Sequence, residues 1–427
     1  MRVLLLGAAG FIGRELLAAL AARGHQVTAV VRRRPDVAPL GAYALATVDL
    51  NRATDPAAWS AHLTDCDAVV NCAGVLQGSR SQSIQAIHAE APIALFRACE
   101  AAGVRRVIQV SAISAERDAG TAYALTKLAA DDFLRSTSLE WTVVRPSLVI
   151  ARGAYGGTAF FRALAALPFV IPVPGEGGEE FQPVHVQDVA RIVVDAIETE
   201  ALVRKTVDPV GPETVTLRRL LEDYRRWLGL PPATVVAIPA PMVRVATWLG
   251  DRFGGPVNST AARQLAFGNT GDAAAFAALA GFTPRRWRDI LAAEPAHAQD
   301  RWHARLYFVR PLLRLALALL WLVSGVGGAF SVRDWTPALA DGTGLPLDVS
   351  AAVLWALCAA DVVMGVLVAS AWRPRRLAGL QFAMIGGYTA VATILWPAMW
   401  ADPLGVLLKN IPILTAVLAW GAIEEDR

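Results

Sequence analysis

The chain has 427 residues, 55% of them hydrophobic and 18% charged, and a formal net charge of +3. A chain of this length is too long for one ordinary domain, so we expect two or three folding units. The small net charge, without a Lys/Arg run interleaved with aromatic residues, argues against a nucleic acid partner.

The four cysteines give no pattern of a disulfide framework or a metal site. Cys66, Cys72, Cys99 and Cys358 include no CxxC pair and have no histidine at ligand spacing. We therefore expect no metal and a reducing compartment. The apolar first residues could pass for a secretion signal, but Arg14 and three spaced glycines interrupt them. We interpret this stretch as a strand and a turn of a cytoplasmic domain.

Residues 1 to about 150 alternate short β-branched runs with helical stretches, which is typical of stacked βαβ units. The sequence predicts strands at Arg2–Leu6, Gln26–Val31, Ala68–Asn71, Arg106–Val110 and Thr142–Arg145. From about 151 to 300, Gly/Pro-rich loops and short helices predict a smaller substrate lobe. The expected fold class of residues 1–300 is α/β, a doubly wound parallel-sheet Rossmann domain with this lobe.

A glycine-rich turn follows the first predicted strand and opens a helix. Gly7, Gly10 and Gly13 have the spacing at which one glycine makes the tight bend, one lets the backbone approach a pyrophosphate, and one lets the helix pack closely on the strand. The unpaired N–H groups at the start of the helix attract phosphate. We therefore predict a dinucleotide site at this turn.

The end of the second predicted strand indicates which dinucleotide binds. A site for NAD carries an acidic residue there for the ribose hydroxyls, whereas this chain carries Arg32, Arg33 and Arg34. An arginine can pair with a 2′-phosphate and stack on adenine. The sequence therefore favours NADP(H) over NAD(H), with Arg32 as the expected contact, while Arg33 and Arg34 also fit a solvated basic loop.

Further motifs follow along the chain in the order of a known family. They are Val48-Asp49-Leu50, Asn71-Cys-Ala-Gly74, Tyr123-Ala-Leu-Thr-Lys127, Arg145-Pro146-Ser147 and Gln182-Pro-Val-His185-Val-Gln-Asp188-Val-Ala190. With these motifs, about the first 290 residues resemble the extended and atypical branches of the short-chain dehydrogenase/reductase family.

The resemblance implies cofactor contacts beyond the glycines. Asp49 is expected to contact the adenine, and Pro146 to lie beside the nicotinamide carboxamide. His185 and Asp188 are expected to be structural, holding the lobe to the sheet. The other expected cofactor-binding residues are Ala9, Phe11, Ile12, Leu50, Ala73, Gly74 and Lys127.

The resemblance also implies the catalytic residues, with Tyr123 as the general acid/base. Lys127 stands four residues later on the same helix face, where it is expected to bind the ribose and to lower the pKa of Tyr123. Ser111 is the expected hydrogen-bond donor to the substrate. Ser114 is the other candidate, and Ala112 stands where relatives often carry serine.

Beyond about Ala304 the chain becomes apolar, and each apolar run is long enough to cross a membrane. The predicted spans are Phe308–Phe330, Ala351–Ala371, Leu377–Trp400 and Leu404–Ile423. A soluble bundle of helices apolar on all sides would have no polar surface for water. We therefore expect residues 305–427 to form an all-α four-helix transmembrane bundle.

Charges near the predicted spans suggest their orientation, because basic residues favour the cytoplasmic side. Arginines open the first span and fill the connection between the second and the third, whereas aspartates follow the first and third spans. This pattern predicts a multi-pass protein of the cytoplasmic (inner) membrane, with the N-terminal domain and the C-terminus in the cytoplasm.

The stretches Arg310–Trp321 and Leu408–Pro412 resemble the DoxX-like family of small membrane proteins. That resemblance implies no particular reaction. Within the predicted spans, Asp361 and Lys409 are costly in lipid, so we expect them to face the bundle interior, where they could pair. The alternatives are an interfacial Lys409 and an Asp361 that only satisfies neighbouring helices.

Together these features predict a membrane-tethered enzyme that transfers a hydride between NADP(H) and a carbonyl or alcohol carbon. Tethering to a membrane suggests a lipophilic substrate, such as a quinone, an isoprenoid or another lipid. Two alternatives stay open. An epimerase or dehydratase would carry the same motifs, and some atypical relatives, including an accessory subunit of respiratory complex I, hold a dinucleotide for structural purposes. The sequence leaves the oligomeric state open.

Overall fold

The computed structural model describes residues 1–34, 41, 43–79 and 81–424. The chain divides into two compact units, unit 1 from Met1 to Ala304 and unit 2 from Arg305 to Arg427. Each unit has its own hydrophobic core.

Unit 1 is built on a parallel sheet of seven strands in the order β11-β6-β5-β4-β1-β2-β3. This order places β4 at the centre with β1 beside it, and a Rossmann fold binds its ligand at the carboxyl ends of the strands where the strand order reverses. The strands are β1 (Arg2–Leu6), β2 (Gln26–Val31), β3 (Ala44–Thr47), β4 (Ala68–Asn71), β5 (Arg106–Val110), β6 (Glu140–Val144) and β11 (Lys205–Val207). The predicted parallel sheet is confirmed, with four of the five predicted strands at the same bounds and the fifth two residues earlier at its start.

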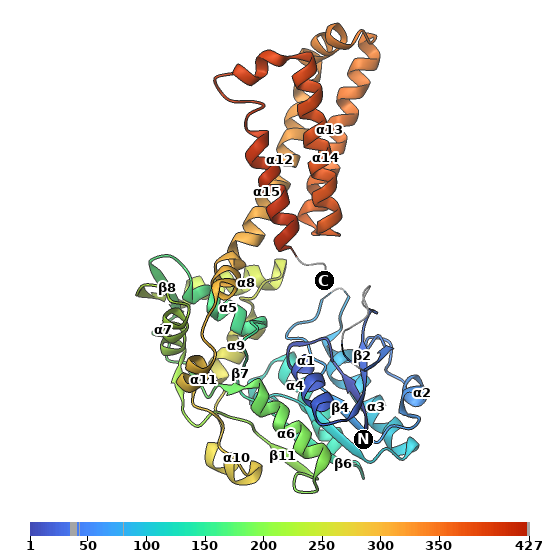
Figure 1. The fold of residues 1–427 in the computed structure, drawn as a ribbon, viewed down its shortest axis with the longest axis vertical. Coiled ribbons are helices and arrows are strands. Elements are labelled where there is room, and N and C mark those ends of the chain that lie inside the picture. Colours follow the sequence, from blue (N-terminus) through green and yellow to red (C-terminus); the bar gives the residue numbers. More distant parts are fainter. Residues whose placement is uncertain (35–40, 42, 80, 425–427) are drawn as a thin grey trace. The chain divides into compact units, whose positions relative to one another are not determined.

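Helices cover both faces of this sheet (Figure 1). On one face α1 (Phe11–Ala22) and α6 (Val186–Glu198) bury apolar side chains against the strands. On the other face the packing helices are α2 (Ser60–Leu63), α3 (Ala91–Ala102) and α4 (Ala122–Arg135). Because helices cover both faces of the sheet, β4 and β5 are buried at every position. Strands buried in this way are mostly apolar, although β4 ends on Asn71 and β5 carries Arg106 and Gln109.

The remaining elements of unit 1 form a lobe beside the sheet. Its core gathers around the buried Tyr224 and Trp287, whose rings meet edge to face. The elements are β7 (Val149–Ile150), α5 (Gly156–Ala165), β8 (Val170–Pro174), β9 (Glu180–Phe181), β10 (Val184–His185), β12 (Val215–Thr216), α7 (Leu217–Trp227), β13 (Thr234–Ile238), α8 (Ala240–Phe253), α9 (Ser259–Phe267), α10 (Ala273–Ala280) and α11 (Trp287–Ala293). Two segments inside the predicted lobe range, α6 and β11, instead belong to the Rossmann layers.

Unit 2 is helical and apolar on its outside. It contains most of α12 (Ala298–Thr343), then α13 (Leu347–Ala369), α14 (Pro374–Leu395), the short 3-10 helix η4 (Pro397–Ala401) and α15 (Asn410–Ile423). Within the described residues, α12, α13 and α14 are long and apolar enough to cross a membrane. Large apolar side chains such as Phe330, which is 85% exposed, face outward, as expected where the surroundings are lipid.

Two details of unit 2 differ from the sequence-based expectation. The fourth predicted span is helical only over the 14 residues of α15, a length of about 21 Å at 1.5 Å per residue. In addition, Asp334 and Asp341 lie inside α12 rather than in a loop. The helix continues past the apolar run and through Pro337, and it ends at Thr343, before Gly344 with its positive φ of 74°.

The interior of unit 2 holds hydrogen-bonded polar side chains. Tyr388 donates a hydrogen bond of 2.9 Å to Asp361, and Trp321 donates one of 2.8 Å to the buried Gln381. The expected pairing of Asp361 with Lys409 is therefore not formed. Lys409 is exposed at the start of α15. The structure therefore agrees with the alternative in which Asp361 bonds to a neighbouring helix, here through Tyr388 of α14.

Candidate functional site

The glycine-rich turn joins β1 to α1 with contacts that side chains would block. Gly7 has a φ of +74°, and a Cβ there would lie 2.7 Å from the backbone N of Ala73. A Cβ on Gly13 would lie 2.0 Å from the carbonyl O of Gly7. The backbone N of Gly10 donates to the Gly7 carbonyl at 2.9 Å, which closes the turn. The three glycines therefore let α1 begin against the carboxyl end of β1.

The start of α1 suits a phosphate group. Gly10 is the N-cap, and its lack of a side chain leaves the first N–H groups of the helix without a side-chain cap. Free N–H groups at the positive end of a helix bind pyrophosphate. Ala9, Phe11 and Ile12 belong to the same turn. A bound nicotinamide dinucleotide would be held here and would supply the hydride donor or acceptor.

Arg32 and Asp49 lie at the carboxyl ends of neighbouring strands, β2 and β3. Asp49 accepts hydrogen bonds from the backbone N and the side-chain Nδ2 of Asn51, at 3.1 and 2.9 Å. These bonds lower the pKa of Asp49, with smaller contributions from Arg52 and Arg32. Arg32 is exposed and lies near Asp49, which Leu50 follows in the chain. Residues 35–40 lie outside the described part of the chain.

Helix α4 brings Tyr123 and Lys127 to the loop after β4. Lys127 is 5% exposed, and its Nζ donates to the carbonyl of Val110 at 3.3 Å. The same Nζ would lie 3.4 Å from a Cβ on Gly74 and lies 5.8 Å from the centre of the Tyr123 ring. Ala73, beside Gly74, also contacts the glycine turn. The structure thus places the predicted pair next to the predicted dinucleotide turn.

Sequence reasoning missed His88, which organises this region. Its Nε2 accepts a hydrogen bond from the backbone N of Val75 at 2.9 Å, and its Nδ1 lies 3.1 Å from Thr126 Oγ1. Burial, together with the charge of Lys127, lowers the pKa of His88 to about 2, so the ring is neutral and Nδ1 carries the proton. The ring also meets Tyr123 edge-on at 5.4 Å. His88 therefore ties the β4 loop to α4.

Asp131, one turn beyond Lys127 on the same face of α4, is the second missed residue. It is fully buried and accepts a hydrogen bond of 2.5 Å from the Ser111 hydroxyl. Ser111, predicted as the donor to the substrate, thus donates to Asp131 in this structure. The repeated spacing of four residues from Tyr123 through Lys127 to Asp131 was the signal in the sequence that could have found it.

Burial sets the protonation of the central tyrosine. Desolvation, with a smaller contribution from the charge of Asp131, raises the pKa of Tyr123 to about 12. The expectation that Lys127 lowers this pKa is not met in the structure, because the Lys127 ammonium is directed to the Val110 carbonyl and its own pKa is lowered by burial. The phenol of Tyr123 is therefore protonated at neutral pH.

Comparison with known families identifies the two parts of the chain. Residues 7–200 match the NAD(P)H-binding family, and residues 318–418 match the DoxX-like family. The chain joins an NAD(P)-binding Rossmann domain to a DoxX-like membrane domain. The first match spans the glycine turn, Asp49, the β4 loop, α4 and Pro146, so it covers the whole candidate site.

Curated relatives match 55–60% of the chain. The mitochondrial NADH dehydrogenase [ubiquinone] 1 alpha subcomplex subunit 9 of Arabidopsis thaliana is 29% identical over 55% of this chain and 61% of its own length. A ceramide reductase of Caulobacter vibrioides is 25% identical over 60% of this chain and 80% of its own length. An uncharacterized protein of Mycobacterium tuberculosis is 29% identical, and the chain spans only 25% of its length.

Solved structures confirm the fold of the Rossmann domain and its lobe. A UDP-glucuronic acid 4-epimerase from Bacillus cereus, solved with UDP-glucuronic acid and NAD, superposes with a TM-score of 0.54. The match covers 72% of this chain and all of that one, at 18% identity. At this identity the likeness shows the fold alone.

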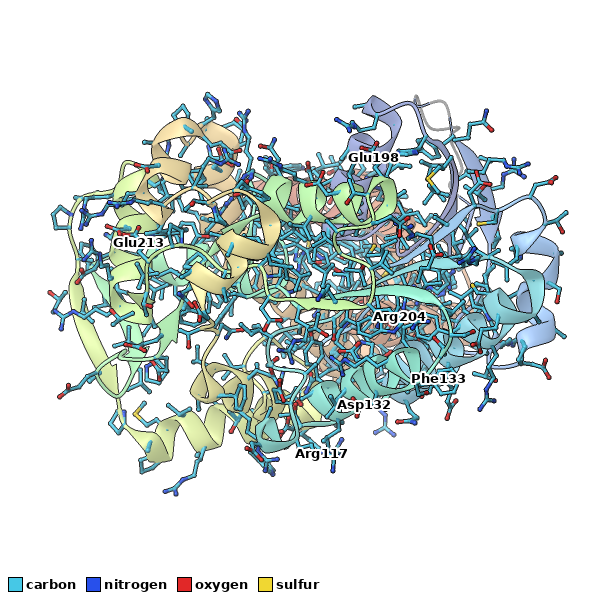
Figure 2. All side chains as sticks on the ribbon, turned by 90° about the horizontal axis from the view of Figure 1, so that it is seen from below. Arg117, Asp132, Phe133, Glu198, Arg204 and Glu213 are labelled. Carbon is cyan, nitrogen blue, oxygen red and sulfur yellow. The ribbon has the colours of Figure 1, made fainter. Side chains whose placement is uncertain are left out.

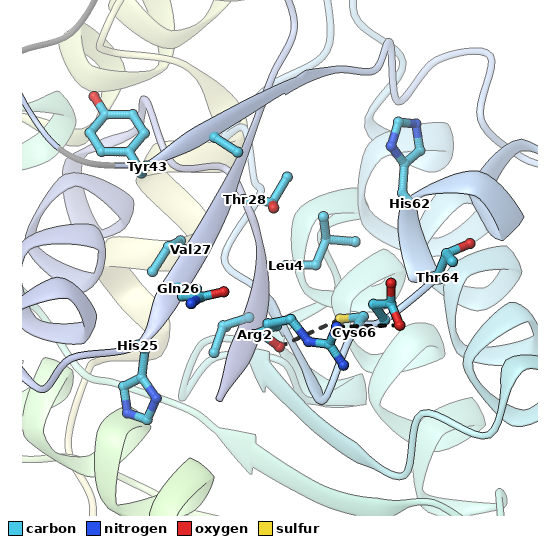
Figure 3. A pocket seen from close by; sticks show the side chains of 13 residues that line it. Arg2, Leu4, His25, Gln26, Val27, Thr28, Tyr43, His62, Thr64 and Cys66 are labelled. Carbon is cyan, nitrogen blue, oxygen red and sulfur yellow. Dashed lines mark hydrogen bonds and ion pairs between the residues drawn. The ribbon is translucent and has the colours of Figure 1, made fainter.

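The hollow shown in Figure 3 lies elsewhere on the Rossmann domain. It is lined by Arg2, Gln26 and Ala44, which begin β1, β2 and β3, and by His62 and Cys66. Ligands of a Rossmann fold bind at the carboxyl ends of its strands. This hollow is at the amino ends, so it is not part of the dinucleotide site.

The loops after β5 and β6 close the site from the side of the lobe. The backbone N of Ile113 donates to the Pro146 carbonyl at 3.1 Å, which joins the two loops. Arg145 forms a two-pronged ion pair with Asp208 and a second pair with Glu116. These bonds raise the pKa of Arg145. They fix the loop that carries Pro146, the residue predicted beside the nicotinamide.

His185 and Asp188 lie at the end of β10 and in the first turn of α6. The Nδ1 of His185 caps the helix by accepting from the backbone N of Gln187 at 3.3 Å, and its Nε2 lies 3.1 Å from Glu294. Arg285 lies 2.5 Å from His185 and 4.0 Å from Asp188. Because Arg285 and Glu294 flank α11 in the lobe, these contacts agree with a structural role.

The buried Asp131 predicts a pH-dependent stability. Burial raises its pKa from 3.8 to about 6. The folded protein binds this proton more tightly than the unfolded chain, so the free energy of unfolding falls as the pH rises from about 4 to about 6. The amide in the Asp131→Asn variant cannot ionise. The free energy of unfolding of this variant, relative to that of the wild type, should therefore rise by roughly 3 kcal/mol between about pH 4 and about pH 6. The melting temperature of both proteins, followed from about pH 4 to pH 7, measures this difference.

The control is Asp132→Asn, in the neighbouring residue. Asp132 lies on the outer side of α4 (Figure 2) and forms an exposed ion pair with Arg135. The Asp132→Asn substitution removes one carboxylate and leaves the buried side chains around Asp131 unchanged. If the two variants show the same pH dependence, the assignment to Asp131 is wrong.

Proposed function

We propose that the chain is an NADPH-dependent reductase that transfers hydride to a carbonyl carbon of a lipophilic substrate at the membrane. The observation that carries the proposal is the placement of Tyr123 and Lys127 beside the glycine turn and the β4 loop. A dinucleotide held by the turn would bring its reactive ring toward this pair. Tyr123 is the proton donor in the proposed reaction.

The protonation of Tyr123 favours reduction over oxidation. Its raised pKa keeps the phenol protonated, which suits proton donation to the oxygen of a carbonyl that accepts hydride. Lys127 would contact the ribose of the bound cofactor. Ser111 would orient the substrate only after its hydroxyl leaves Asp131.

The DoxX-like domain supports the choice of a lipophilic substrate. A bilayer concentrates quinones, isoprenoids and other lipids beside an enzyme that is tethered to it. We propose that the domain lies in the cytoplasmic membrane with the Rossmann domain in the cytoplasm, because Arg373, Arg375 and Arg376 cluster at the start of α14.

A structural role for the dinucleotide is the second candidate. The bond between Ser111 and Asp131 favours it, because the hydroxyl predicted to bind the substrate is already used inside the domain. A subunit of respiratory NADH dehydrogenase among the relatives points the same way. An epimerase or dehydratase is the third candidate, and it would regenerate the cofactor in every cycle.

Arg32→Ala tests the choice of NADPH. The substitution should weaken NADPH binding about 10- to 100-fold. This factor corresponds to the loss of about 1–3 kcal/mol, which is typical of a charge-assisted hydrogen bond to a phosphate. NADH binding should change little, because NADH has no 2′-phosphate. Fluorescence titration of the full chain in detergent with each dinucleotide gives both dissociation constants, and Arg33→Ala is the matched control. Equal losses for NADPH and NADH would contradict the proposed contact.

The reaction itself is tested with the full chain and a panel of lipophilic carbonyls, including a quinone and a long-chain ketone. Oxidation of NADPH that depends on the added carbonyl supports the reductase. Cofactor that co-purifies and neither exchanges nor becomes oxidised supports the structural candidate. Isomerised or dehydrated product with no net change in the cofactor supports the epimerase or dehydratase.

A further inference from the structure

Helix α8 of the lobe exposes an unusual amount of apolar surface. Met242, Val245, Trp248 and Phe253 are 59%, 59%, 64% and 76% exposed, and Leu249 is 43% exposed. Many other large apolar side chains of unit 1 pack in buried cores, and the exposed Leu76, Leu125 and Phe169 lie in separate segments of the chain. A continuous exposed apolar patch in a soluble domain marks an interaction surface.

The exposed residues form one face of the helix. Met242, Val245, Leu249 and Phe253 follow the spacing i, i+3, i+7, i+11, which lines them up along α8. The helix is held on its other side at Gly250, where a Cβ would lie 1.7 Å from the carbonyl of Val257. The close contact at Gly250 holds α8 on the lobe and leaves the apolar face exposed.

The chemistry of α8 fits a bilayer surface better than another protein. Arg244 and Arg252 lie outside the apolar face, Arg252 beside it, where they can reach anionic headgroups, and Trp248 stands at its edge. A helix with arginines on its polar side and large apolar side chains on the other lies in the interface plane of a membrane.

The covalent structure of the chain brings a bilayer within reach. Unit 1 ends at Ala304, and the apolar part of α12 follows within a few residues. Trp302, just before that point, is 65% exposed. A domain tethered this closely meets lipid at a high local concentration, so even a weak interfacial helix would be engaged.

We propose that α8 is an interfacial helix that buries its Met242, Val245, Leu249 and Phe253 face in the surface of the membrane. A pocket of the lobe lies at the start of α8 and is lined by Pro174, Glu179, Ile238, Pro239 and Val243 among others. Membrane contact along α8 would place this pocket at the level of the lipid headgroups. The inference concerns a surface outside the Tyr123 site and holds whether or not the domain is a reductase.

Photocrosslinking of the full chain in lipid nanodiscs tests this surface. Leu249 is replaced with p-benzoylphenylalanine, an aromatic residue that an exposed apolar position accepts. The matched control carries the same probe at Asp251, which is exposed on the polar side of the same helix. After irradiation, mass spectrometry of the α8 peptide should show lipid adducts from position 249 and none above background from position 251.

Three outcomes would overturn the proposal. Equal lipid adducts at both positions would show that α8 has no preferred face toward lipid. Crosslinks from position 249 to a second copy would identify a dimer surface, and crosslinks only within the chain would show that protein covers this face. The probe at Met242 repeats the test on the same face, so that failure of one variant to fold does not decide the result. Thermal unfolding of each variant reports folding separately.

Discussion

Tyr123→Phe should abolish most carbonyl reduction and leave dinucleotide binding unchanged. The substitution removes only the hydroxyl, which the reductase proposal makes the proton donor. A positioned general acid contributes about 100- to 10,000-fold to a rate, so kcat should fall by about that factor. The ring should keep its edge-on contact with His88. The measurements are steady-state turnover with the best carbonyl and the NADPH dissociation constant of the same preparation.

The control for this variant is Tyr43→Phe, which removes a phenol hydroxyl from the hollow at the amino ends of the strands. Turnover should stay at the wild-type value. Full function of Tyr123→Phe would rule out the proposed acid. If Tyr123→Phe keeps full function and the bound cofactor does not exchange, the structural role of the dinucleotide becomes the preferred function.

The central strands could be predicted because burial on both faces leaves short runs that are mostly β-branched and apolar. Arg106–Val110 is buried at every position and was found with its bounds. The edge strands β3 and β11 were missed. Ala44–Thr47 is half-exposed and only four residues long, and Lys205–Val207 has three. At an edge, pairing to one neighbour stabilises a strand whose own sequence pattern is weak.

The candidate site could be predicted where a single residue type carries the chemistry, as at Gly7 and Gly13. Interactions between side chains far apart in the sequence were not visible. Nothing in the sequence near Ser111 indicates that its hydroxyl would donate a hydrogen bond to a carboxylate 20 residues later. His88 was missed for the same reason, because its partners Val75 and Thr126 are brought together only by the fold.

In the membrane domain, hydropathy predicted where the helices are but not where they end. The first helix continues to Thr343 although it contains Pro337, and it ends where Gly344 adopts a positive φ. The fourth begins only at Asn410, since Gly405 adopts a positive φ and breaks the chain into turns. Apolar length is therefore a guide to lipid contact, whereas local backbone preference decides the ends of each helix.

Gly13→Ala should weaken both the fold of the Rossmann domain and its dinucleotide binding. Inside a helix, replacing glycine with alanine normally adds about 1 kcal/mol of stability. Here the new Cβ would stand 2.0 Å from the Gly7 carbonyl O and 2.9 Å from Ala8 Cα. Because those neighbours are backbone, α1 must move away from β1, which costs about 1–3 kcal/mol or more and exceeds the gain.

The shift of α1 also moves the N–H groups that would hold the pyrophosphate, so NADPH affinity should fall roughly tenfold to a hundredfold. Gly157→Ala is the matched control, because Gly157 also lies in a helix but nothing stands within 4 Å of its Cβ position. Thermal unfolding and NADPH titration of both variants measure the two effects separately. Unchanged affinity in Gly13→Ala would mean that the dinucleotide does not rest on this turn, and the assignment of the cofactor site would have to be abandoned.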